Sequence, residues 1–214
     1  MHPLTRLAIF AGPSLAVADR IKHDAIVYLP PAARGDVARA SREYDAVLLI
    51  DGVFHHDLAP SPKECFEALE HARMFGASSM GALRACECAP YGFTALGAIA
   101  RWYIAEVIDG DDEVAVLTHP QTHVALSVAL VNVRYLAWRA ARRGLLSRTA
   151  ASDLVRQSRS IFYMDRTWDD VLDLVPRAQR DALQALVDDN GDLKALDARF
   201  ALRSTLRLLG TVAA

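Results

Sequence analysis

The chain has 214 residues, of which 52% are hydrophobic and 23% charged, and its formal net charge is −2. This length can hold one sizeable core, or a core with a helical appendage, and the composition is typical of a soluble globular protein. The near-neutral charge gives no reason to expect nucleic acid or an anionic membrane as a partner. No stretch approaches the ~20 apolar residues of a membrane span. Nothing near Met1 resembles a signal peptide, so we expect a cytoplasmic protein.

Short apolar runs alternate with helical patterns over the first part of the chain. The run 46–50 is apolar without alternation, as expected for a strand covered on both faces of a parallel sheet. The expected strands are 7–10, 25–29, 46–50 and 74–75, and helices are expected over 15–22, 36–44 and 61–72. The fold class is therefore α/β, a small parallel sheet wrapped by helices, with additional helices towards the C-terminus.

The pattern changes after residue 85. A helix is expected over 102–107, an acidic loop over 109–113, and a fifth strand at the sheet edge over 114–119. Amphipathic periodicity then predicts only helices, over 124–143, 149–162, 168–174, 177–188 and 193–209. We expect a single domain over residues 1–214. Its α/β core covers 1–120, and a helical part over 121–214 packs on that core.

Arginines are concentrated between residues 134 and 166. They are Arg134, Arg139, Arg142, Arg143, Arg148, Arg156, Arg159 and Arg166. Solvated helix faces are the default explanation for such a cluster. A surface that docks an acidic protein partner is the alternative, and RNA binding is a third, although aromatic residues do not interleave with these arginines.

The cysteines predict buried thiols. Cys65, Cys86 and Cys88 are too few for a disulfide framework and favour a reducing compartment. Cys86 and Cys88 are two residues apart on an expected helix, so they point to different faces and would form a poor metal site. The adjacent histidines of the loop 53–60 have no partner at helical spacing, which predicts an exposed loop. We therefore expect no metal ion.

Small and polar residues follow three of the expected strands. Gly12 follows the first strand, Asp51 and Gly52 follow the third, and the turn 76–79 follows the fourth. Loops beyond the carboxyl ends of parallel strands carry the working residues of such sheets, so these positions are candidates for a site. The loop at Gly12 lacks the Gly-x-Gly-x-x-Gly fingerprint, which disfavours a dinucleotide cofactor.

The turn 76–79, here called the serine turn, consists of very small residues and leads from the fourth expected strand into a helical run. Either Ser78 or Ser79 starts this helix, and its hydroxyl is a candidate nucleophile. A hydroxyl there would lie beside unpaired amides and the positive end of a helix dipole. The amides near Met80 and Gly81, together with Arg84, would then stabilise an oxyanion. The alternative is that the serine only caps the helix.

A lysine follows a predicted helix start. In the capping box at 61–64, Ser61 caps the helix and Glu64 reaches back to the cap amide. This places Lys63 in the first turn, where the helix dipole disfavours a cation and favours a neutral amine that could act as a base. A lysine exposed to solvent near the helix start is the alternative.

Several runs of the sequence resemble the TfuA family, and together they extend over nearly the whole chain. They are residues 10–14, 28–36, 50–54, 62–64, 75–85, 111–116 and 162–168. The run 75–85, Phe-Gly-Ala-Ser-Ser-Met-Gly-Ala-Leu-Arg-Ala, is highly specific to that family.

The resemblance implies a role beside a YcaO enzyme, which converts a peptide backbone amide to a thioamide. The TfuA-like protein is expected to hydrolyse the C-terminal thiocarboxylate of a ThiS-like sulfur carrier protein, to release sulfide, and to assist YcaO in binding its peptide substrate. It implies a Ser–Lys catalytic pair, which falls on Ser79 and Lys63 in this chain, with no metal or organic cofactor. A non-catalytic adaptor that only strengthens capture of the peptide by YcaO is the main alternative. A general serine esterase is a third.

Overall fold

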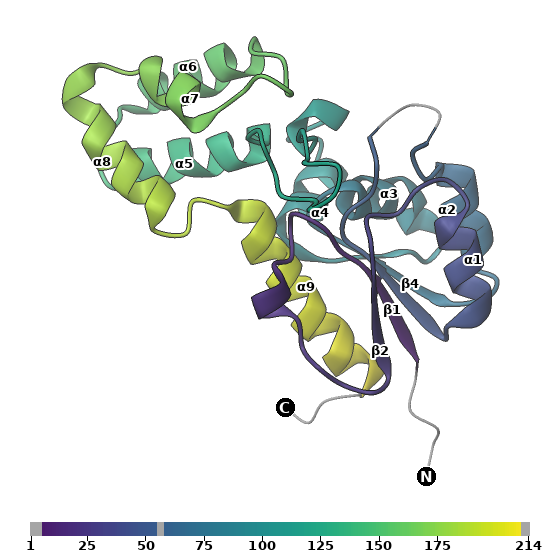
Figure 1. Cartoon of the computed structure of the whole chain (residues 1–214). Coiled ribbons are helices and arrows are strands. Elements are labelled where there is room, and N and C mark those ends of the chain that lie inside the picture. The colour runs from purple at the N-terminus through teal and green to yellow at the C-terminus, as the bar shows by residue number, and fades with distance from the viewer. Residues whose placement is uncertain (1–5, 55–57, 211–214) are drawn as a thin grey trace. The chain divides into compact units, whose positions relative to one another are not determined.

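The computed structural model describes residues 6–54 and 58–210 (Figure 1). The chain divides into two compact units. The first combines Met1–Asp109 with Asp197–Ala214, and the second is Gly110–Leu196. Residues 197–214 thus belong to the same unit as residues 1–109. Within the described ranges, no helix is long and apolar enough to cross a membrane.

The first unit contains a five-stranded parallel sheet, which confirms the α/β fold class. Its strands are β1 (Leu7–Phe10), β2 (Ile26–Leu29), β3 (Ala46–Leu49), β4 (Arg73–Gly76) and β5 (Thr94–Ala95). The strand order is β2-β1-β3-β4-β5. The chain therefore turns in opposite directions after β1 and after β3. At such a switch point the two following loops diverge, which favours a ligand site at the carboxyl edge of the sheet.

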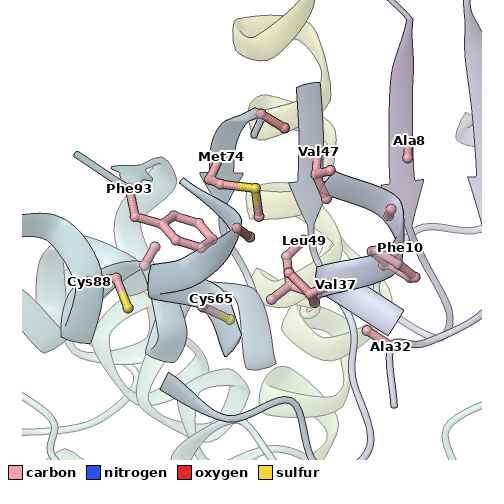
Figure 2. Close-up of a cluster of buried hydrophobic side chains, with 14 residues drawn as sticks. Ala8, Phe10, Ala32, Val37, Val47, Leu49, Cys65, Met74, Cys88 and Phe93 are labelled. Carbon is pink, nitrogen blue, oxygen red and sulfur yellow. The ribbon is translucent and has the colours of Figure 1, made fainter. Parts of the chain in front are cut away.

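Helices cover both faces of this sheet. Along β1 and β3, successive side chains alternate between two buried clusters. One cluster packs against α1 (Asp36–Glu43), α2 (Pro62–Ala68) and α3 (Met80–Cys88), as Figure 2 shows for Val37, Cys65 and Cys88. The other packs against α9 (Leu193–Leu209) through its alanine and leucine side chains. Burial of both faces explains why β3 is apolar at every position.

The fifth strand predicted over 114–119 is wrong. Val114 and Ala115 are buried after the short 3-10 turn η3 (Asp111–Glu113), and Thr118 makes only an isolated antiparallel bridge to Ala125. The fifth strand is instead the two-residue β5, which pairs with β4. A short apolar run does not by itself distinguish a strand from another buried segment, and this explains the error.

Other helix predictions in the first unit were partly wrong. The helix expected over 15–22 is only the 3-10 turn η1 (Val17–Asp19), and the one expected over 102–107 is α4 (Gly97–Ile104). The capping box at α2 is also wrong. The Ser61 hydroxyl does accept the Glu64 amide, at 3.1 Å. The Glu64 carboxylate, however, accepts the first amides of α1, from Val37 and Ala38, instead of the Ser61 amide.

The second unit is helical, as predicted. It contains α5 (Leu130–Arg142), α6 (Arg148–Arg159), α7 (Trp168–Asp173) and α8 (Arg177–Asp188), whose apolar faces share one core. The start of α5 lies later than expected, because the preceding residues form a turn in which the Leu126 amide donates to the Leu117 carbonyl at 2.8 Å.

Two arginines of this unit do not lie on solvated helix faces. Arg139 is buried and donates to the Leu186 carbonyl at 2.7 Å and to the Asp189 carboxylate at 2.7 Å. Arg166 is fully buried, with 0% exposure. Its guanidinium donates to three backbone carbonyls, those of Val128, Ser158 and Ile161. The explanation by solvated helix faces is therefore wrong for these two side chains, which instead form hydrogen bonds inside the helical unit.

Candidate functional site

The serine turn connects β4 to α3 in a strained conformation. Ser78 has a φ of 66°, in the left-handed region that favours glycine. The Ser79 amide donates to the Ala77 carbonyl at 2.8 Å, which closes a three-residue turn around Ser78. Turns of this kind with a positive φ are rare and strained, and such strain is concentrated at functional sites.

Ser79 is the N-cap residue of α3, as the sequence predicted for one of the two serines. Ser79 is 2% exposed. In the described structure, its hydroxyl accepts no hydrogen bond from the first turn of α3. The alternative in which this serine serves only as a side-chain cap is therefore not supported. The hydroxyl stands at the start of α3, beside the positive end of its dipole.

Two glycines allow the start of α3 to pack closely against the sheet. A Cβ atom at Gly81 would overlap the carbonyl oxygen of Leu49, and one at Gly76 would overlap the carbonyl oxygen of Gly81. The Gly81 amide donates to the Ile50 carbonyl at 3.1 Å. Only residues without a side chain allow this approach, which fixes the serine turn at the carboxyl edge of the sheet.

The donors expected around an oxyanion are not equally available. The Gly81 amide is engaged by Ile50. Arg84 is buried and donates to the Pro60 carbonyl at 2.7 Å and to the Glu87 carboxylate at 2.5 Å, so it ties α3 to the segment before α2. Among the described residues, the Met80 amide makes no hydrogen bond. Among the described backbone amides from residue 77 to residue 83, that of Met80 is therefore the one without a hydrogen-bond acceptor.

A second polar group fills the switch point between β1 and β3. The Asp51 carboxylate is buried and accepts the Gly12 amide at 2.8 Å and the Ser14 amide at 3.0 Å. It also accepts the Ser14 hydroxyl at 2.6 Å. A Cβ atom at Gly52 would lie 2.8 Å from the Met80 side chain. The structure thus gathers most of the predicted edge residues, and it adds Ser14, which follows Gly12 by two residues and was missed.

Lys63 is not brought to the serine turn. Its side chain is 83% exposed, and its Nζ lies 3.8 Å from a carboxylate oxygen of Glu67. The start of α2 instead contacts the far end of α3, where the Cys88 thiol donates to the Pro62 carbonyl at 3.5 Å. The helical rise places Cys88 about 13 Å along α3 from Ser79. The position of the Lys63 amine therefore matches the alternative of a lysine exposed to solvent near the helix start.

Asp197 of α9 contacts the serine turn, although the sequence analysis did not identify it. Its carboxylate accepts the Ser78 amide at 3.1 Å, across 119 residues of sequence, and the Ala98 amide at 2.5 Å. Desolvation by burial raises the pKa of Asp197 to about 6, whereas the amide hydrogen bonds and the positive charge of Arg101 lower it. No local pattern marks this residue, because it sits within an ordinary amphipathic helix.

The cysteine thiols are buried or half-buried, as predicted. Burial raises the pKa of Cys65 and of Cys88, which makes both thiols unreactive. Within the part of the chain that the structure describes, no three His, Cys, Asp or Glu side chains are grouped as metal ligands. The loop histidines His55 and His56, and Asp57, lie outside the described residues.

A family model described as TfuA-like protein matches residues 51–167. No curated protein matches the chain. The matched segment is more than half of the 214 residues and contains the complete serine turn, Lys63 and Arg166, whereas Gly12 and Asp197 lie outside it. The protein therefore belongs to the TfuA family.

Proposed function

We propose that this TfuA-like protein provides sulfur for peptide backbone thioamidation by a YcaO enzyme. It hydrolyses the C-terminal thiocarboxylate of a ThiS-like sulfur carrier protein to release sulfide, and it assists YcaO in engaging the peptide. The observation that carries the proposal is the strained serine turn, which combines the Ser79 hydroxyl with an amide of Met80 that makes no hydrogen bond among the described residues. Family membership supports the partner role.

The chemistry is acyl transfer to serine followed by hydrolysis. The Ser79 oxygen attacks the terminal carbonyl carbon while a base accepts the hydroxyl proton. The thiocarboxylate is already anionic, so the tetrahedral intermediate needs donors such as the Met80 amide, and one such donor typically lowers the barrier by about 3 kcal/mol. The base then gives its proton to the sulfur as the carbon–sulfur bond breaks, and hydrosulfide leaves. Water cleaves the acyl-serine, which yields a carboxylate on the carrier and restores the hydroxyl.

The base is assigned to Lys63 because of the family resemblance. The ion pair of Lys63 with Glu67 is exposed, and exposed pairs at this helical spacing contribute only about 0.3–0.5 kcal/mol. Breaking this pair therefore costs little, but because the start of α2 contacts the far end of α3, the assignment also requires α2 to move towards the serine turn when the carrier docks. Since the chain contains three lysines, Lys22, Lys63 and Lys194, the assignment requires a test of each one.

Hydrolysis is tested with purified protein and a thiocarboxylated carrier, following conversion of the thiocarboxylate to the carboxylate by intact mass spectrometry. We expect Ser79→Ala and Lys63→Ala to lose about 10³-fold or more in rate, because each removes a group that takes part in bond formation. Lys22→Ala and the exposed Ser160→Ala serve as matched controls. Wild-type rates in both Ser79→Ala and Lys63→Ala would refute the pair, and loss only in Lys194→Ala would reassign the base.

A complete thioamidation reaction separates the hydrolase from the adaptor. With the carrier as the sulfur source, Ser79→Ala should abolish thioamide formation, and added free sulfide should restore it because hydrolysis is then bypassed. The product is the peptide thioamide, measured by mass spectrometry. An adaptor would be indifferent to Ser79→Ala with either sulfur source. Turnover of small activated esters without any carrier would instead indicate a general esterase.

A further inference from the structure

The mechanism above leaves one buried carboxylate at the serine turn without a role. Asp197 is 4% exposed and comes from α9, on the face of the sheet opposite α1, α2 and α3. Its two oxygens accept amides from two different segments, Ser78 in the serine turn and Ala98 in the first turn of α4. Hydrogen bonds from amides to an ionised carboxylate are stronger than those between neutral groups.

The site of this carboxylate is built to receive it. Gly97, which precedes Ala98, has a φ of 86°, and an added Cβ atom there would overlap the Asp197 carboxyl group. Gly97 therefore serves two purposes, since its backbone conformation and its missing side chain both leave room for the carboxylate. One side chain thus joins the serine turn, the start of α4 and α9.

Asp197 acts on the strained residue of the turn. Ser78 carries the positive φ, and the donor that Asp197 holds is the amide of Ser78 itself. A strained conformation persists only where the surrounding structure holds it in place. Without this acceptor, the buried amide would lose its bond to the carboxylate and the turn could relax towards a negative φ, which would reorient the following residues Ser79 and Met80.

We infer that Asp197 is a positioning residue for the nucleophile: by holding the Ser78 amide, it fixes the backbone from which the Ser79 hydroxyl and the Met80 amide project. This inference rests on the proposed hydrolase function, which it deepens. The described hydrogen bonds of the Asp197 carboxylate go to backbone amides, so it acts on the site through the backbone. Its effect should therefore appear in the rate of the chemical step and not in the affinity for the carrier.

The inference is tested by the near-isosteric Asp197→Asn variant and by Gly97→Ala, which displaces the carboxylate without removing its charge. A positional error of about 1 Å at a nucleophile costs about 10²-fold in rate, so we expect a loss of kcat of that order with KM unchanged. Asp19→Asn is the matched control, because it removes the carboxylate of another contact to α9, the 3.2 Å bond from Arg199. It should leave kcat unchanged.

A pH profile adds a readout that a general loss of stability would not produce. Below a pKa of about 6, the protonated Asp197 oxygen no longer accepts an amide, so kcat of the wild type should fall as the pH drops through that value. The charged side chain that acts on this carboxylate from α4 is Arg101, and Lys194 precedes it by three residues on α9. Asp197→Asn should lack the step near pH ~6 and keep only the pH dependence that protonation of the base imposes on both proteins.

Hydrogen exchange of the peptide 76–82 tests the same inference without any turnover. Exchange should accelerate in Asp197→Asn, and in the wild type below pH ~6 after correction for the intrinsic rate, while it stays unchanged in Asp19→Asn. A wild type that leaves the carrier intact refutes the proposed hydrolysis, and the exchange experiment then still decides whether Asp197 holds the turn. If the wild type is active and Asp197→Asn has the same kcat, pH profile and exchange rate, the positioning role of Asp197 is refuted and the proposed hydrolysis is not.

Discussion

Gly81→Ala is expected to prevent the first unit from forming a stable fold. The new methyl group would occupy the position of the Leu49 carbonyl oxygen in β3, and its neighbours there are backbone atoms that cannot turn aside as a side chain can. Relief requires α3 to move away from the sheet, which would break the bond from the Gly81 amide to the Ile50 carbonyl. Overpacking of a rigid site costs about 3 kcal/mol or more, a large part of the stability of a domain.

The prediction is checked by soluble yield and by urea unfolding monitored by circular dichroism. Gly92→Ala is the matched control, because an added Cβ atom at Gly92 would meet no atom within 4 Å and would pay only for its positive φ of 106°. That conformation costs about 1–2 kcal/mol for a residue with a side chain. If Gly81→Ala were no less stable than Gly92→Ala, the close packing of α3 on β3 would be wrong.

Arg166→Met is expected to destabilise the second unit by about 3–5 kcal/mol. Methionine replaces the aliphatic part of the side chain but donates no hydrogen bond. The carbonyls of Val128, Ser158 and Ile161, now bonded at 3.0–3.1 Å, would lose these bonds in a buried site. Each unsatisfied buried polar group costs about 1–3 kcal/mol, so the total is large even if the unit relaxes.

Chemical denaturation of the variant measures this effect, with Arg156→Met as the control. Arg156 lies in α6 and makes an exposed ion pair with Asp153 at 2.8 Å, so its replacement should cost less than about 1 kcal/mol. Equal losses in the two variants would contradict a structural role for Arg166. Since Arg166 lies in the run 162–168 that resembles the TfuA family, a large loss would show that this run specifies the helical fold.

Periodicity in the sequence was sufficient to predict most of the elements. The strands β1, β2 and β3 lie where uniformly apolar runs are bounded by turn residues, and β4 contains the predicted Met74 and Phe75. The helices α8 and α9 begin and end at the predicted residues. The packing partner of α9 was not predictable, because an amphipathic helix shows only that one face is buried and not against which core. The same limit applies to β5, which consists of two residues and carries no periodic signal.

The candidate site was predictable only where its residues follow a strand. Gly12, Asp51 and the serine turn were found because the carboxyl ends of parallel strands meet at one edge. Asp197 was missed because its role depends on a contact across 119 residues. Lys63 became a candidate through the dipole of its own helix and was assigned the catalytic role by the family resemblance, and neither argument says where α2 lies. The contacts of Pro60 and Pro62 with α3 determine that position.

The return of α9 to the first unit has a consequence for biosynthesis. During translation, all five strands are synthesised long before residue 197 leaves the ribosome. Until then, the face of the sheet that packs against α9 is uncovered. Apolar surface exposed in this way invites aggregation and engages chaperones. The bond from the Ser78 amide to Asp197 also forms only at this last stage. A nascent chain that has not yet exposed residue 197 therefore lacks the contact that holds the Ser78 amide in the serine turn.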